Sequence, residues 1–159
     1  MNEITSPASS PSSKATAGTE HKGRIVVGVD GSASSIDALR YAVRAARAFG
    51  TTLEAMTVWT YPAGAELAML AGWSPENDAH EILDAAVQEV FGNSRPSWLS
   101  TTTLSGPPAR ALIEESAGAE MLVLGSRGHG GFVGLLLGSV SATCAEHARC
   151  PVLIVHPAA

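Results

Sequence analysis

The stretch from Met121 to Ser141 is the part of this sequence that most constrains the fold. A short apolar run is followed by a glycine-rich segment, and a segment of helical period then begins at Gly138-Ser139. This order predicts a strand, a loop and the N-terminus of a helix. The glycines that crowd the loop are Gly125, Gly128, Gly130, Gly131 and Gly134.

Such a loop combines two properties that favour anion binding. Glycine lets a ligand approach the backbone closely, and a helix N-terminus offers unpaired N–H groups and the positive end of a dipole. Ser139 adds a hydroxyl at the same place. A flexible surface loop with a serine helix cap is the alternative interpretation.

The spacing of the glycines excludes two common phosphate-binding loops. A Walker loop needs Gly-Lys-Ser/Thr, but the only lysines are Lys14 and Lys22, far upstream. The dinucleotide fingerprint G-x-G-x-x-G fails because Val133 stands where the third glycine is required. The spacing that remains is G-x2-G-x9-G-S, from Gly125 to Ser139.

The rest of the chain alternates between strand-like and helix-like segments. This alternation predicts an α/β fold, a single-domain open parallel sheet of five strands flanked by helices. Thr60–Trp73 is interpreted as a mobile loop with about one helical turn that could cover a ligand. Strands are expected at residues 24–30, 53–59, 98–104, 121–124 and 152–155, and helices at about 34–50, 75–92, 107–118 and 139–148. The third strand is the most polar, so it is expected at an edge of the sheet.

Candidate ligand-binding residues lie at the ends of three of the predicted strands. Asp30 ends the first strand, Val58 lies near the end of the second and Gly125 ends the fourth. In an open parallel sheet the ligand binds outside the carboxyl ends of the strands, where the strand order reverses. The sequence therefore predicts a ligand site at this edge.

Charge and composition exclude several classes of function. The net charge of −5 offers no basic field for nucleic acid. No apolar run is long enough for a membrane span and the N-terminus has no apolar signal core, so a cytoplasmic location is expected. Two cysteines make no disulfide framework and are expected to be reduced. The five histidines show no metal-ligand spacing.

The N-terminal 22 residues differ in composition from the rest. They consist largely of Ser, Thr, Pro and Ala and cannot bury enough apolar surface to offset the entropy of ordering. Residues 1–22 are therefore expected to be a disordered tail. Residues 23–159 are expected to form one domain.

From Gly23 to His156 the sequence resembles the universal stress protein family. The segments that carry the resemblance are IVVGVDGS, GPPARALIEESA, LVLGSRGHGG, LLGSVS and CPVLIV. The resemblance implies a Rossmann-like fold of the adenine nucleotide alpha hydrolase-like type, with strand order 3-2-1-4-5. The intact glycine pattern resembles the ATP-binding branch of the family.

The resemblance also implies a set of nucleotide-binding residues. Asp30 is placed near the adenosine, although an aspartate that caps a turn is the alternative. Arg127 is a candidate phosphate contact, although an exposed loop arginine fits equally well. His129 is the other cationic candidate in the loop, and a solvent-facing side chain is its alternative. The full implied set is Gly28, Val29, Asp30, Val58, Leu124, Gly125, Arg127, Gly128, Gly138, Ser139, Val140 and Ser141. Mg²⁺ is expected only with the nucleotide, and no metal site of the protein's own is expected.

The function that follows is an ATP-binding universal stress protein that acts as a nucleotide-dependent regulator of stress response or signalling. A slow ATPase or phosphate-ester hydrolase is one alternative. It is disfavoured because the loop has no Walker lysine and Asp30 is the sole acid at the strand ends. A dimeric scaffold with a vestigial nucleotide site is the other.

A homodimer through the last strand is expected. Residues Val152–Val155 are apolar, and the implied strand order places them at an edge. Exposed apolar edges are covered or paired in most proteins. Antiparallel pairing with the same strand of a second copy would satisfy the edge under two-fold symmetry. The family resemblance implies the same dimer.

Overall fold

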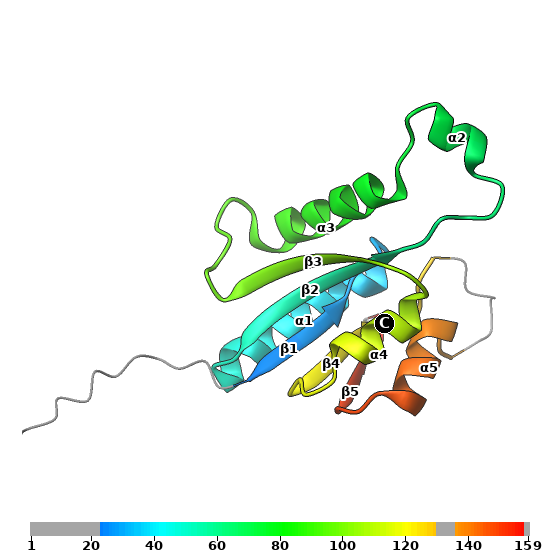
Figure 1. Ribbon diagram of the computed structural model, residues 1–159. Coiled ribbons are helices and arrows are strands. Elements are labelled where there is room, and N and C mark those ends of the chain that lie inside the picture. The colour runs from blue at the N-terminus through cyan, green and yellow to red at the C-terminus, as the bar shows by residue number, and fades with distance from the viewer. Residues whose placement is uncertain (1–22, 130–135, 158–159) are drawn as a thin grey trace, which may run out of the picture.

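The computed structural model describes residues 23–129 and 136–157 (Figure 1). The predicted tail, Gly130, Gly131 and Gly134 lie outside the described residues. The strands are β1 (Arg24–Gly28), β2 (Thr52–Trp59), β3 (Leu99–Ser105), β4 (Met121–Gly125) and β5 (Val152–Val155). The helices are α1 (Ala33–Phe49), α2 (Glu66–Leu70), α3 (Pro75–Phe91), α4 (Pro108–Glu115) and α5 (Ser139–His147).

The five strands form one parallel sheet in the order β3-β2-β1-β4-β5, which confirms the implied topology. The strand order reverses between β1 and β4, because the chain first extends the sheet toward β3 and then returns to the other side of β1. The polar strand β3 lies at one edge, as predicted, and β5 lies at the other.

Helices cover both faces of the sheet, and alternate residues of the strands divide the core between them. Ile25 and Val27 pack with α1 and α3 on one face, whereas Val26 packs with α4 and α5 on the other. Figure 1 shows α4 and α5 in front of the sheet and α1 behind it. The central strand β1 is buried on both sides for this reason.

Two helix boundaries correct the sequence interpretation. α1 begins at Ala33 rather than near Ser34, because the hydroxyl of Ser32 caps it by accepting a hydrogen bond from the N–H of Ser35 (3.2 Å). α5 has Gly138 as its N-cap, without a side-chain cap hydrogen bond, so Ser139 is the first helical residue and the serine-cap interpretation is wrong.

Other boundaries follow the expected capping chemistry. Gly50 ends α1 in the left-handed conformation, and Ser74 and Pro75 open α3 as cap and first helical residue. α4 stops at Glu115, before the expected Gly118. β1 ends at Gly28, so Asp30 lies in the turn beyond the strand.

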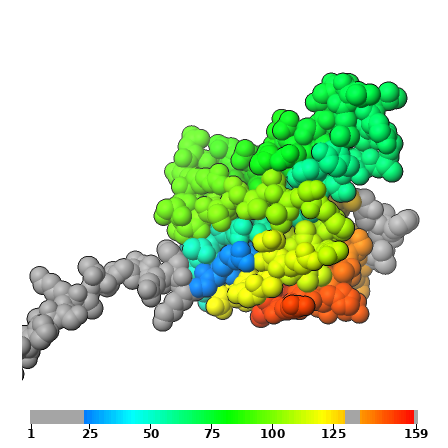
Figure 2. Space-filling model, in the orientation of Figure 1, coloured from blue at the N-terminus to red at the C-terminus, as the bar shows by residue number. Residues whose placement is uncertain are grey.

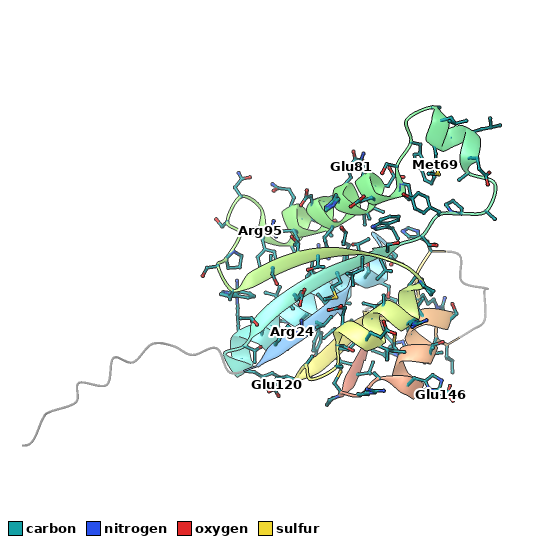
Figure 3. All side chains as sticks on the ribbon, in the orientation of Figure 1. Arg24, Met69, Glu81, Arg95, Glu120 and Glu146 are labelled. Atoms are coloured by element: carbon teal, nitrogen blue, oxygen red, sulfur yellow. The ribbon has the colours of Figure 1, made fainter. Side chains whose placement is uncertain are left out.

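The segment between β2 and α3 contains a short helix, α2, in agreement with the predicted single turn. Figure 2 shows this segment standing out from the body of the domain. Figure 3 places Met69 at this projection, whereas Arg24 and Glu120 lie at the opposite end of the sheet, where β1 and β4 begin. No residue of α2 is buried, and none lines the cavity described below.

Candidate functional site

A cavity of about 320 Å³ opens at the carboxyl ends of β1, β2 and β4. It lies where the strand order reverses, the position at which open α/β sheets bind their ligands. All twelve residues expected from the sequence line it: Gly28, Val29, Asp30, Val58, Leu124, Gly125, Arg127, Gly128, Gly138, Ser139, Val140 and Ser141.

The structure adds five lining residues to this set: Ser35, Met56, Pro108, Leu112 and His129. Met56 precedes Val58 by two positions on β2, so the alternation of a strand places both on the same face. This two-residue period was the signal in the sequence that could have identified Met56 as a lining residue. Pro108 and Leu112 come from α4, and only the tertiary fold brings them to the cavity.

The cavity has an apolar side and a polar side. Met56, Val58 and Leu112 belong to the apolar cluster between the sheet and α4. The opposite side is formed by the loop after β4 and the N-terminus of α5, with Arg127, His129 and the backbone of Gly138 and Ser139. A ligand with an apolar ring at one end and an anionic group at the other matches this division.

Asp30 lies at the centre of a hydrogen-bond network on the polar side. Its Oδ1 accepts hydrogen bonds from the N–H (2.9 Å) and the hydroxyl of Ser32. Its Oδ2 accepts one from the N–H of His129 (3.3 Å), which is 99 residues away in the sequence. The carboxylate therefore joins the turn after β1 to the loop after β4.

The pKa of Asp30 is lower than its ordinary value. Burial acts to raise the pKa, but it is outweighed by hydrogen bonds from the side chain and backbone of Ser32, then from the Ser35 hydroxyl, and by the nearby charge of His129. Asp30 is consequently ionised at neutral pH. A proton-accepting role in hydrolysis would have to compete with these hydrogen bonds.

The described ends of the glycine loop are held together by backbone and hydroxyl contacts. The N–H of Gly138 donates to the carbonyl of Ser126 (2.7 Å), and the hydroxyl of Ser141 donates to the carbonyl of Gly125 (2.6 Å). The N–H of Arg127 donates to the hydroxyl of Ser34 (3.4 Å). The loop therefore leaves β4 and enters α5 at neighbouring points.

Ser139 and Ser141 have different surroundings. Ser141 is buried, and its hydroxyl braces the loop through Gly125. Ser139 is exposed at the cavity, and its hydroxyl has no hydrogen-bond partner within residues 23–129 and 136–157. Ser139 is therefore the one whose hydroxyl is available to a ligand.

The three glycines of the signature are also unequal. Gly138 has φ −70°, which any residue adopts, and a Cβ there would make only ordinary van der Waals contacts, the nearest with the backbone nitrogen of Gly128 at 3.5 Å. Gly128 has Asp30 Oδ2 where its Cβ would lie (2.5 Å), and Gly125 has Ser34. A Cβ at residue 125 would therefore meet backbone and one at residue 128 would meet the Asp30 carboxylate, whereas a Cβ can be accommodated at residue 138.

Metal and membrane features can be stated for the described residues. They contain no cluster of three or more His, Cys, Asp or Glu side chains that could hold a metal ion. None of the helices in this part of the chain has the length and apolarity needed to cross a membrane. Cys144 and Cys150 are both free thiols.

The sheet order and the cavity at its switch point define a doubly wound α/β protein with a cavity at the strand ends. The chain belongs to the universal stress protein family, whose sequence profile matches residues 22–156.

One relative in sequence and two solved structures are similar to this chain. A universal stress protein of Mycolicibacterium smegmatis is 35% identical over 139 residues, which cover 83% of this chain and 47% of that protein. The structure of universal stress protein UspA from Lactobacillus plantarum has a TM-score of 0.70 at 24% identity, with 84% and 97% of the two chains covered. A universal stress protein in complex with cAMP has a TM-score of 0.57 at 29% identity, with 86% and 98% covered. The chain spans about half the length of the mycobacterial relatives that it matches.

Proposed function

We propose that this chain binds an adenine nucleotide, ATP in particular, in the strand-end cavity. The observation that carries the proposal is the division of the cavity into an apolar side from β2 and α4 and a polar side at the N-terminus of α5, which begins at Ser139. The apolar side suits a purine ring, and the α5 N-terminus suits phosphates. The solved relative in complex with cAMP supports the same class of ligand. Mg²⁺ would enter only with the nucleotide.

We infer further that the protein acts as a nucleotide-dependent regulator of stress response or signalling. Slow turnover of ATP is expected, because the cavity-lining acid, Asp30, is engaged by Ser32 and His129. Bound nucleotide would then act by changing the conformation or the partners of the protein. The proposed homodimer through β5 is the first candidate for such an effect.

Calorimetric titration with ATP, AMP, cAMP and GTP tests the proposal. One ATP per chain is expected, with weaker binding of GTP. Val58→Phe should weaken binding because it fills the apolar side of the cavity. Leu104→Phe is the matched control, since Leu104 pairs with Val58 in the β2–β3 register but does not line the cavity.

A turnover assay on the same protein separates the alternatives. Binding without appreciable phosphate release supports a regulator, whereas steady release that is abolished by Val58→Phe would identify a hydrolase. Absence of binding to all four nucleotides would contradict the proposal and leave a scaffold role.

A further inference from the structure

Two segments distant in the sequence meet at the Asp30 carboxylate. These are the turn after β1, which carries Ser32, and the start of the glycine loop at Gly128 and His129. Ser32 holds Asp30 from one side, and Ser32 also caps α1. The turn at Ser32 therefore fixes the carboxylate in the position from which it contacts the loop.

Asp30 Oδ2 contacts two neighbouring residues of the loop. It accepts a hydrogen bond from the N–H of His129 (3.3 Å) and lies 2.5 Å from the position that a Cβ of residue 128 would take. The loop backbone just before these residues is held by Ser34 of α1, through the N–H of Arg127. The first residues of the loop are thus shaped from outside the cavity by the chain around the α1 N-terminus.

We propose that Asp30 is a positioning residue for the phosphate side of the cavity, which it holds in shape through Gly128 and His129, rather than a contact for the nucleoside. This inference rests on the proposed nucleotide function. It assigns to Asp30 a role different from the adenosine contact that the family resemblance implies.

The negative charge of Asp30 and its positioning contact have opposite effects on ATP affinity. A carboxylate close to a triphosphate repels it, so removal of the negative charge alone would strengthen ATP binding. Removal of a positioning contact would weaken it. In Asp30→Asn the amide has only one acceptor oxygen, so its NH₂ group must face the N–H of either Ser32 or His129. Either the contact with His129 or the contact with Ser32 that fixes the side chain is then lost, while the size of the side chain is kept.

The test compares ATP with adenosine, which lacks the phosphates. In Asp30→Asn the dissociation constant for ATP should rise by about tenfold or more, whereas that for adenosine should stay within about twofold. Asp37→Asn is the matched control, because Asp37 lies on α1 outside the cavity and pairs with Arg40. Neither dissociation constant should change in that variant.

Gly128→Ala perturbs the same contact without a change of charge. Its methyl group would lie 2.5 Å from Asp30 Oδ2, so the carboxylate must shift. The same selective loss of ATP affinity is therefore expected. This variant decides the question if Asp30→Asn does not fold. Amide hydrogen exchange at residues 126–129 should also be faster in both variants without nucleotide, because the loop loses its external support.

Two results would overturn the proposal. An equal loss of ATP and adenosine affinity would show that Asp30 contacts the nucleoside directly. Unchanged or tighter ATP binding in both variants would show that the carboxylate does not shape the phosphate side. If the parent protein binds neither ligand, the nucleotide function itself fails, and unaltered exchange at residues 126–129 would then reject the positioning role separately.

Discussion

Gly125 lies directly against the backbone of Ser34. A Cβ added at residue 125 would contact the Ser34 hydroxyl and would lie 2.7 Å from the carbonyl carbon and oxygen of Ser34. Both residues are buried where the N-terminal turn of α1 crosses the end of β4. The first glycine of the G-x2-G-x9-G-S pattern is therefore explained by packing of a helix on a strand.

This contact predicts that Gly125→Ala destabilises the fold. A methyl group cannot be placed without moving the α1 backbone, and overpacking of this kind costs about 1–3 kcal/mol. Gly138→Ala is the matched control, because its φ is −70° and the nearest atom to its Cβ is 3.5 Å away. Denaturant unfolding should show the loss for Gly125→Ala alone. Equal stability of the two variants would contradict this account.

Ser139 and Ser141 should separate binding from stability. Ser139→Ala removes an exposed hydroxyl at the cavity that caps no helix, so ATP affinity should fall by about ten- to a hundredfold with the melting temperature unchanged. Ser141→Ala removes the buried hydrogen bond to Gly125, so about 1 kcal/mol of stability should be lost. Calorimetry and thermal unfolding of both variants would check this. A destabilised Ser139→Ala protein would restore the cap interpretation.

The fold could be predicted largely because its signals are local. Gly50, Gly92 and the Ser74-Pro75 pair mark helix ends by capping chemistry that acts within one turn. The strands of the parallel sheet are apolar runs, and the polar β3 stands apart as an edge. The start of α1 was misplaced by one residue, because several serines there can cap and only the geometry of the turn selects Ser32.

The site was harder to predict wherever its parts are distant in the sequence. Spacing identified the glycines, but it could not reveal that Asp30 faces Gly128 or that Ser34 faces Gly125. Leu112 reaches the cavity because α4 crosses β2, a relationship that no short motif encodes. The sequence thus located the cavity, whereas the reason for each glycine required the tertiary structure.

The lowered pKa of Asp30 predicts a pH dependence of stability. The ionised carboxylate is favoured in the folded state, so its contribution is fully present above the unfolded pKa and is lost as the pH falls through the lowered folded pKa. The melting temperatures of the parent and Asp30→Asn should differ most above about pH 5, and the difference should shrink as the pH falls below that value. A difference that stays constant across this range would show that the charge of Asp30 is not involved.

The outer edge of β5 predicts how the proposed dimer can be broken. The carbonyl of Pro151 accepts a hydrogen bond from Leu122 of β4, and that of Val155 accepts one from Ser126, directly after β4. Backbone groups alternate in direction along a strand, so those of Ile154 point toward the free edge. Ile154→Pro removes an N–H that antiparallel pairing with a second copy would use, at a position where an edge strand tolerates proline.

The protein should therefore sediment as a dimer at micromolar concentration, and Ile154→Pro should sediment as a monomer that still unfolds cooperatively. Ile154→Val keeps the N–H and the branched side chain and should remain dimeric. A monomeric parent protein, or a dimeric Ile154→Pro variant, would show that β5 is not the dimer contact.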